Sequence, residues 1–142
     1  MSKIVVGVDG SQGSRAALRW AHEEAQLRKC ELEIVTVWQF PITTTLPAFG
    51  AMPTPEDLGG EAERALVAAV ADEGIVSTTD VPVTILVAEG AAASALLDAA
   101  NDADLLVVGS RGHGGFAGLL LGSVSQQCVT HAPRPVVVVP AA

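Results

Sequence analysis

Short apolar runs, rich in β-branched residues, alternate along the chain with longer segments that carry apolar residues on one face. Each run ends at turn-forming residues, which is typical of a buried strand, whereas the longer segments have the spacing of amphipathic helices. The pattern predicts strands at residues 4–8, 32–38, 81–87, 105–108 and 135–139. It predicts helices at residues 11–29, 92–100 and 123–131.

The segment between the second and third predicted strands is less regular. Residues 39–60 contain four prolines and two phenylalanines, and long irregular segments of this kind are usually functional or disordered. The sequence Thr-Pro-Glu-Asp at 54–57 has the order of a helix start, with a cap, a proline and two acids. Because Gly59 and Gly60 weaken a helix, we expect its firm part to begin nearer residue 61 and to run to residue 73.

Strands and helices alternate throughout, and the sequence shows no internal repeat. This alternation predicts right-handed βαβ units around a parallel sheet with helices on both faces. A chain of 142 residues is long enough for a real core, so we expect residues 1–142 to form one α/β domain. The ligand crevice of such a sheet lies at the carboxyl ends of the strands, where the strand order reverses.

Composition and charge narrow the class of partner. Hydrophobic residues make up 49% of the chain, yet no apolar run approaches the roughly 20 residues that span a bilayer. A parallel sheet that is buried on both faces explains the high hydrophobic content better than a membrane span does. The formal net charge of −8 argues against nucleic acid and against anionic membrane surfaces, because both require clustered cations. The first strand follows the initial methionine almost at once, without a signal peptide, so we expect a cytoplasmic protein.

A glycine-rich loop follows the fourth predicted strand and leads into the last helix, which opens at Ser123, a good N-cap residue. Glycines let backbone N–H groups approach a ligand closely, and a helix N-terminus offers unpaired N–H donors. The loop also contains Arg111, the only Lys or Arg between Arg64 and Arg134. Together these features suit a polyphosphate. On spacing alone, a simple chain turn followed by a helix cap remains the alternative.

The spacing Gly109-x2-Gly112-x9-Gly122-Ser123 resembles the nucleotide-binding signature of the universal stress protein family, in its ATP-binding branch. Further stretches resemble the family's first strand and turn, first helix, and closing helix and strand; they are residues 6–11, 17–21, 122–125 and 132–139. The resemblance covers nearly the whole chain in the right order. It departs at Ala92, where relatives often carry proline, which bears on how that helix starts.

The resemblance implies a Rossmann-like sheet of five strands in the order 3-2-1-4-5. It also implies a cytosolic module that binds ATP, with Mg²⁺, and whose nucleotide sets its conformation or partner choice in a stress response. The candidate nucleotide-binding residues are Gly7, Val8, Asp9, Val37, Val108, Gly109, Ser110, Arg111, Gly112, His113, Gly114, Gly122, Ser123, Val124 and Ser125.

Several of these residues have two interpretations. In the functional interpretation, Asp9 contacts a ribose hydroxyl or Mg²⁺. In the alternative interpretation, its side chain only stabilises its own turn. The backbone of Val37 meets the adenine edge by resemblance, while its side chain packs in the core. Ser125 contributes its hydroxyl to the same anion or is merely a solvated helix residue. Trp20 and Trp38 are more typical of packing than of base stacking, and Trp38 is the better candidate for the pocket rim.

We assign no catalytic residue, because the sequence lacks a Walker Gly-x4-Gly-Lys-Ser/Thr motif, a nucleophile–base pair and a His-x-Gly-His signature. A slow ATPase or a nucleotidyl-transfer enzyme on the same α/β core is the alternative function. A nucleotide-free interaction protein is a third, which the intact glycines oppose. The two cysteines and three histidines have no metal-ligand spacing, so we expect buried cysteines and no metal cluster.

The last predicted strand, residues 135–139, is almost wholly apolar. The strand order implied by the resemblance places it at the edge of the sheet, and an exposed apolar edge strand pairs unless it is covered. The resemblance likewise implies dimers through this strand. We therefore expect a homodimer, the alternative being an edge covered by residues 39–60 of the same chain.

Overall fold

The computed structural model describes residues 2–39, 54–111 and 121–141. Its strands are β1 (Lys3–Gly7), β2 (Glu31–Trp38), β3 (Val83–Glu89), β4 (Leu105–Gly109) and β5 (Val136–Val139). Its helices are α1 (Gln12–Arg28), α2 (Pro55–Asp72), α3 (Ala92–Ala100) and α4 (Ser123–His131). Every predicted element is present, and only the start of α2 and the position of β3 differ notably from expectation.

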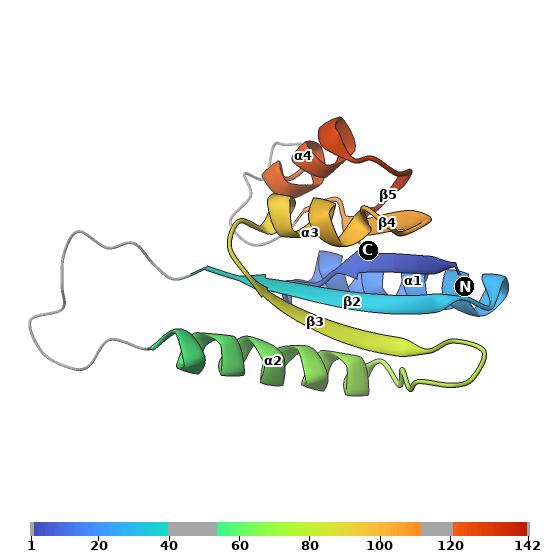
Figure 1. The fold of residues 1–142 in the computed structure, drawn as a ribbon, viewed down its shortest axis with the longest axis horizontal. Coiled ribbons are helices and arrows are strands. Elements are labelled where there is room, and N and C mark those ends of the chain that lie inside the picture. The colour runs from blue at the N-terminus through green and yellow to red at the C-terminus, as the bar shows by residue number, and fades with distance from the viewer. Residues whose placement is uncertain (1, 40–53, 112–120, 142) are drawn as a thin grey trace, which may run out of the picture.

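The five strands form one parallel sheet in the order β3-β2-β1-β4-β5, which confirms the predicted α/β class and order. β1 is the central strand: Ile4 pairs with Leu32 of β2 on one side and with Leu105 of β4 on the other. The chain therefore runs outward through β2 and β3 and returns past β1 to β4 and β5 (Figure 1). This reversal lies between β1 and β4.

Side chains alternate between the two faces of the sheet and build two separate cores. Ile4 and Ile34 belong to the core that α1 and α2 cover, to which α2 contributes Leu66. Val5 and Val35 belong to the core under α3 and α4. β1 is buried from Ile4 to Val6 because both faces are covered, as the continuous apolar run predicts.

β3 begins two positions later than predicted, at Val83 rather than at residue 81. The backbone N–H of Thr78 donates to the carbonyl of Val81 at 3.0 Å, and the N–H of Val81 donates back to the Thr78 hydroxyl at 3.0 Å. These bonds close a turn and bury Val81. The first apolar residue of the run therefore packs beneath a turn instead of extending the strand.

α2 begins at Pro55, so the expectation that its firm part starts near residue 61 is wrong. Thr54 and Asp57 form a capping box in which each side chain accepts a bond from the other's backbone N–H at 3.1 Å. The bond from the Thr54 N–H holds the pKa of Asp57 below its usual value. Gly59 lies against the ring of Trp38, so capping and packing together outweigh the low helix propensity of glycine.

An ion-pair cluster ties the amino ends of the strands together. The ammonium of Lys3 lies 2.9 Å from Asp102 and 3.8 Å from Glu33, and the Lys3 backbone N–H donates to Asp104 at 3.0 Å. The hydrogen bond to Asp102 raises the pKa of Lys3. These contacts lie at the opposite end of the sheet from the strand-to-helix loops that follow β1 and β4.

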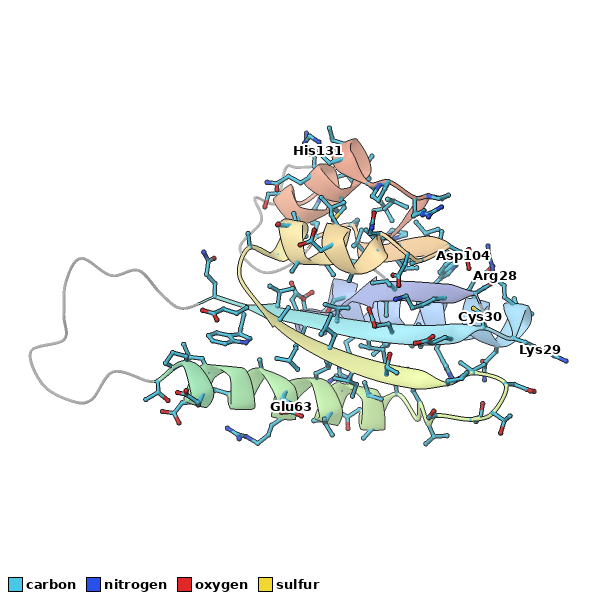
Figure 2. All side chains as sticks on the ribbon, viewed as in Figure 1. Arg28, Lys29, Cys30, Glu63, Asp104 and His131 are labelled. Atoms are coloured by element: carbon cyan, nitrogen blue, oxygen red, sulfur yellow. The ribbon has the colours of Figure 1, made fainter. Side chains whose placement is uncertain are left out.

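Both cysteines are buried and free, as predicted. Burial raises the pKa of the Cys30 thiol and raises that of Cys128 to about 11. Figure 2 shows Cys30 near Arg28 and Asp104 at the amino end of the sheet. Within the described residues, no three acidic, histidine or cysteine side chains form a metal-ligand group, and no helix is long and apolar enough to cross a membrane.

Replacing the α2 cap tests why this helix starts at Pro55. Thr54→Ala should lower the free energy of unfolding by about 1 kcal/mol, the typical cost of losing a side-chain N-cap. Urea denaturation followed by circular dichroism measures the change. Thr130→Ala is the control, because that exposed hydroxyl only donates back to a carbonyl of its own helix at 2.9 Å. Equal stability of Thr54→Ala and wild type would contradict the capping role.

Candidate functional site

Two turns meet where the strand order reverses, at the carboxyl ends of β1 and β4. β1 and β4 are paired neighbours, with Val6 opposite Val107. Asp9 follows β1 and Ser110 follows β4. In doubly wound sheets the ligand crevice lies at this switch point, so the fold brings together the two sequence stretches that carry most of the predicted residues.

Asp9 forms a turn that is locked to the first turn of α1. One carboxylate oxygen accepts from the backbone N–H of Ser11 at 2.9 Å and from its hydroxyl at 2.5 Å. The Asp9 N–H donates to the Ser14 hydroxyl at 3.2 Å, and Ser11 caps α1 by accepting from the Ser14 N–H at 3.2 Å. The turn-stabilising interpretation of Asp9 is therefore confirmed, and the carboxylate is held at the mouth of the switch point.

Gly109 allows the first turn of α1 to approach the end of β4. A Cβ on Gly109 would lie 2.8 Å from the backbone of Gly13, and a Cβ on Gly13 would lie 2.7 Å from the carbonyl oxygen of Arg111. Real Cβ atoms do not make contacts this short with backbone. The described contacts thus assign Gly109 to close backbone packing, where the sequence suggested room for a phosphate.

The N-terminus of α4 is tied directly to the residue that follows β4. The backbone N–H of Gly122 donates to the Ser110 carbonyl at 2.6 Å. The buried hydroxyl of Ser125 lies 3.0 Å from that carbonyl and 3.0 Å from the Gly122 carbonyl. Ser125 is therefore neither solvated nor turned toward a ligand: it fastens α4 to β4. The N-cap is Gly122 rather than Ser123, so the predicted cap is one residue too late.

The first N–H groups of α4 have no acceptor among the described residues. α1 and α2 have side-chain caps, whereas α3 and α4 have none. In α4, the N–H of Gln126 donates to the carbonyl of Gly122 at 2.9 Å. For the N–H groups of Ser123, Val124 and Ser125, the described part of the chain supplies no acceptor. Together with the helix dipole, such groups form a site for an anion.

Arg111 is the cation of this region. It is exposed, and none of the described carboxylates forms an ion pair with it. Arg15 and Arg19, on α1, are instead paired with acids at the end of α2. Ser110 and Arg111 also line an open hollow of about 640 Å³ that extends over the end of β5 to Pro140. This hollow lies one strand away from the switch point.

Val37 extends past the end of β1. The last bond between β1 and its neighbour runs from the N–H of Val8 to the carbonyl of Val35 at 2.8 Å. Backbone groups two residues apart point to the same side of a strand, so the N–H and C=O of Val37 point to the side of β2 on which β1 lies, beyond the end of β1. The Val37 side chain packs on the core beneath α3. Both parts of the prediction for Val37 thus have a geometric basis.

The remaining predicted residues support the crevice or fall outside the description. Val8 and Val108 are buried core residues, and a Cβ on Gly7 would lie 2.9 Å from Leu96 of α3. Gly112, His113 and Gly114 lie outside the described residues. The sequence reasoning missed Gly13 and Ser14. Their signal was the sequence Ser11-Gln-Gly-Ser14, a capping pattern that contains a glycine where a helix former is expected.

This geometry defines a doubly wound parallel α/β domain with its topological switch point between β1 and β4. Residues 1–140 match the model of the Universal stress protein family. A protein of that family from Mycolicibacterium smegmatis is 39% identical over 136 residues, covering 96% of this chain and 45% of the relative. The chain belongs to the universal stress protein family.

Other relatives and solved structures agree. A universal stress protein of Mycobacterium tuberculosis is 34% identical over 140 residues, 96% of this chain and 46% of its own length, so the chain spans about half the length of these curated relatives. UspA from Lactobacillus plantarum shares the fold at a TM-score of 0.76 and 22% identity, covering 97% of both chains.

Two solved relatives contain an adenine nucleotide. A universal stress protein in complex with cAMP is 26% identical with a TM-score of 0.69, covering 99% of this chain and 98% of the other. The universal stress protein from Archaeoglobus fulgidus in complex with dAMP is 25% identical with a TM-score of 0.60, covering 98% of both.

The contact between Gly109 and Gly13 gives a stability prediction. Gly109→Ala and Gly13→Ala should each lower the free energy of unfolding by about 1–3 kcal/mol, because the added methyl overpacks a backbone contact. Gly60→Ala is the control, since its methyl would meet only the flexible end of Arg64 at 3.3 Å; it should stabilise α2 by about 0.5–1 kcal/mol. Thermal unfolding that ranks the three variants alike would contradict the assignment.

Proposed function

We propose that this domain binds ATP in the crevice between β1 and β4 and acts as a nucleotide-dependent module. The observation that carries the proposal is the uncapped N-terminus of α4, held at the switch point by the bond of Gly122 to Ser110. Three N–H donors that lack an acceptor among the described residues, near a carboxylate turn and an arginine that no described carboxylate pairs, suit a phosphate chain followed by a sugar.

The phosphates would lie against the N–H groups of Ser123, Val124 and Ser125. Arg111 would supply the positive charge that an acidic chain otherwise lacks there, because a guanidinium donates to phosphate oxygens in a charge-assisted manner. Gly112, His113 and Gly114 belong to this part of the site by resemblance. The Ser125 hydroxyl would remain bonded to backbone carbonyls, with its N–H facing the ligand.

The nucleoside would lie toward β1 and β2. Asp9 would accept from a ribose hydroxyl, and the backbone of Val37 would meet the adenine edge. The relatives that hold cAMP and dAMP support an adenine nucleotide. Asp9 is the one acid among the proposed residues, so Mg²⁺ would arrive with the nucleotide, bound chiefly by phosphates and water. Its contribution is to neutralise phosphate charge.

The biological role is proposed by resemblance to the family. We propose that the domain works in the cytoplasm as a stress-response module whose bound nucleotide selects its conformation or partner. We assign no residue that activates a water, and binding rather than turnover is the activity proposed. Whether bound ATP is hydrolysed is measured directly by incubating the purified protein with MgATP and quantifying ADP.

ATP binding is the first prediction of this proposal. Calorimetry with MgATP should give a micromolar dissociation constant, which corresponds to a binding free energy of about 8 kcal/mol in magnitude. Gly122→Val should abolish it by filling the space beside the phosphates. The Gly122 backbone, at φ −70° and ψ 166°, is accessible to valine, so circular dichroism should show an intact fold. Absence of both heat and a thermal shift at millimolar nucleotide would refute ATP binding.

Arg111 gives a second, milder test. Arg111→Ala should weaken the binding of ATP by roughly 1–3 kcal/mol, which is the typical contribution of a hydrogen bond to a charged group. It should weaken the binding of adenosine much less. Arg64→Ala is the matched control, because it removes an exposed cation from α2 with the same change in net charge. Equal losses for ATP and adenosine, or equal effects of the two variants, would rule out a phosphate contact at Arg111.

We also propose that the protein is a homodimer built on β5, which is an edge strand of the sheet. Leu106 donates to the carbonyl of Pro135 at 3.0 Å, and Ser110 donates to that of Val139 at 2.8 Å. By alternation, the backbone groups of Val136 and Val138 point away from β4. An isologous pairing with a second copy would satisfy them.

This geometry selects the substitution that tests the dimer. Val138→Pro removes an outward N–H without removing a bond to β4, whereas Val138→Ala shortens the same side chain and keeps the N–H. Sedimentation should give wild type and Val138→Ala a mass near twice 14.5 kDa and should give Val138→Pro the monomer mass. A monomeric wild type at micromolar concentration would refute the proposal.

A further inference from the structure

The end of β2 is clamped from two directions at Trp38. Val37 packs on the core under α3, so the next side chain, Trp38, points to the opposite face, toward α2. A Cβ on Gly59 of α2 would lie 3.3 Å from Cζ2 of the indole and 3.4 Å from Nε1. The indole therefore rests on the helix backbone at a glycine, where an added Cβ would require the ring to shift by a few tenths of an ångström.

The second constraint acts on the backbone. Trp38 pairs with Glu89 at the end of β3, and the Trp38 carbonyl accepts from the N–H of Gly90 at 2.9 Å. One side of the strand end is thus bonded to β3, and one face is fixed on α2. The N–H and C=O of Val37, which point to the side of β2 on which β1 lies but beyond the end of β1, are held in place by their neighbour rather than by β1.

We propose that Trp38, seated on Gly59, is a positioning residue that fixes the Val37 backbone for recognition of a purine base and thereby sets the preference for adenine. The inference rests on the nucleotide-binding function proposed above. Adenine offers a donor and then an acceptor along its pairing edge, and guanine offers them in the reverse order. A backbone N–H and C=O held rigidly in one place distinguish the two, whereas a mobile pair adapts to both.

The glycine pair of α2 supplies a sharp test. Gly59→Ala presses a methyl on the indole, while Gly60→Ala makes the same change one position along, where the methyl meets only Nη1 of Arg64 at 3.3 Å. Both changes raise the intrinsic helix propensity of α2, so circular dichroism should show the helix retained in both variants. Only Gly59→Ala should disturb base recognition, which a purely structural role of Trp38 does not predict.

The experiment measures binding of MgATP, MgGTP and inorganic tripolyphosphate with Mg²⁺ by calorimetry. Trp38→Ala should weaken ATP binding at least about tenfold and bring the ratio of the ATP and GTP association constants close to one. The affinity for tripolyphosphate should change by less than about twofold. Trp38→Phe should restore the preference to within about threefold of wild type, because an aromatic ring still rests on Gly59. Gly59→Ala should lower the ratio of the ATP and GTP association constants, and Gly60→Ala should leave that ratio unchanged.

The outcomes separate this proposal from the function on which it rests. A wild-type protein that binds none of the three ligands refutes nucleotide binding itself. A wild type that prefers ATP, with the same preference in Trp38→Ala and Gly59→Ala, refutes only the positioning role. Equal weakening of ATP and tripolyphosphate by Trp38→Ala also refutes it. If Trp38→Ala fails to fold by circular dichroism, Gly59→Ala and Trp38→Phe decide.

Discussion

The close approach of two backbones, at Gly13 of α1 and Gly109 of β4, is the contact on which the carboxyl end of the sheet depends. It allows the first turn of α1 to lie against the end of β4. Ser14, in the same turn, accepts from the backbone of Asp9, and Ser110, next to Gly109, accepts from α4. The contact between Gly13 and Gly109 therefore positions both the Asp9 turn after β1 and the N-terminus of α4 after β4.

In a chain of net charge −8, the proposed anion site depends on where positive charge is left unneutralised. Several cations are held by nearby acids: Lys3 by Asp102, Arg28 by Glu24, and Arg19 by Glu73. The N-terminus of α4 and Arg111 lie apart from these pairs. Arg111 is therefore the cation nearest the N-terminus of α4 that no described carboxylate neutralises, whereas Lys29, Arg64 and Arg134, which also lack an ion pair among the described residues, lie in other parts of the fold.

Elements that depend on local pattern were predictable from sequence, and close contacts between distant segments were not. The β-branched run at β1 and the alanine stripe of α1 lead directly to the observed sheet and helix. The early start of α2 was missed because Gly59 is explained only by Trp38, which lies far away in sequence. In the candidate site, the position of Asp9 follows from its turn. The packing role of Gly109 required knowing that Gly13 faces it.

β1 lies at the centre of the sheet, yet its two partners are made at very different times. The bond from Lys3 to Asp104 joins residues 101 positions apart, so one side of β1 stays unpaired on the ribosome until β4 has been synthesised. An N-terminal fragment therefore contains the Asp9 turn but no crevice. A ligand that binds only when β1 and β4 are paired stabilises chains that have reached this stage and leaves shorter ones unaffected, so a nucleotide bound as proposed would favour chains in which both sides of β1 are paired.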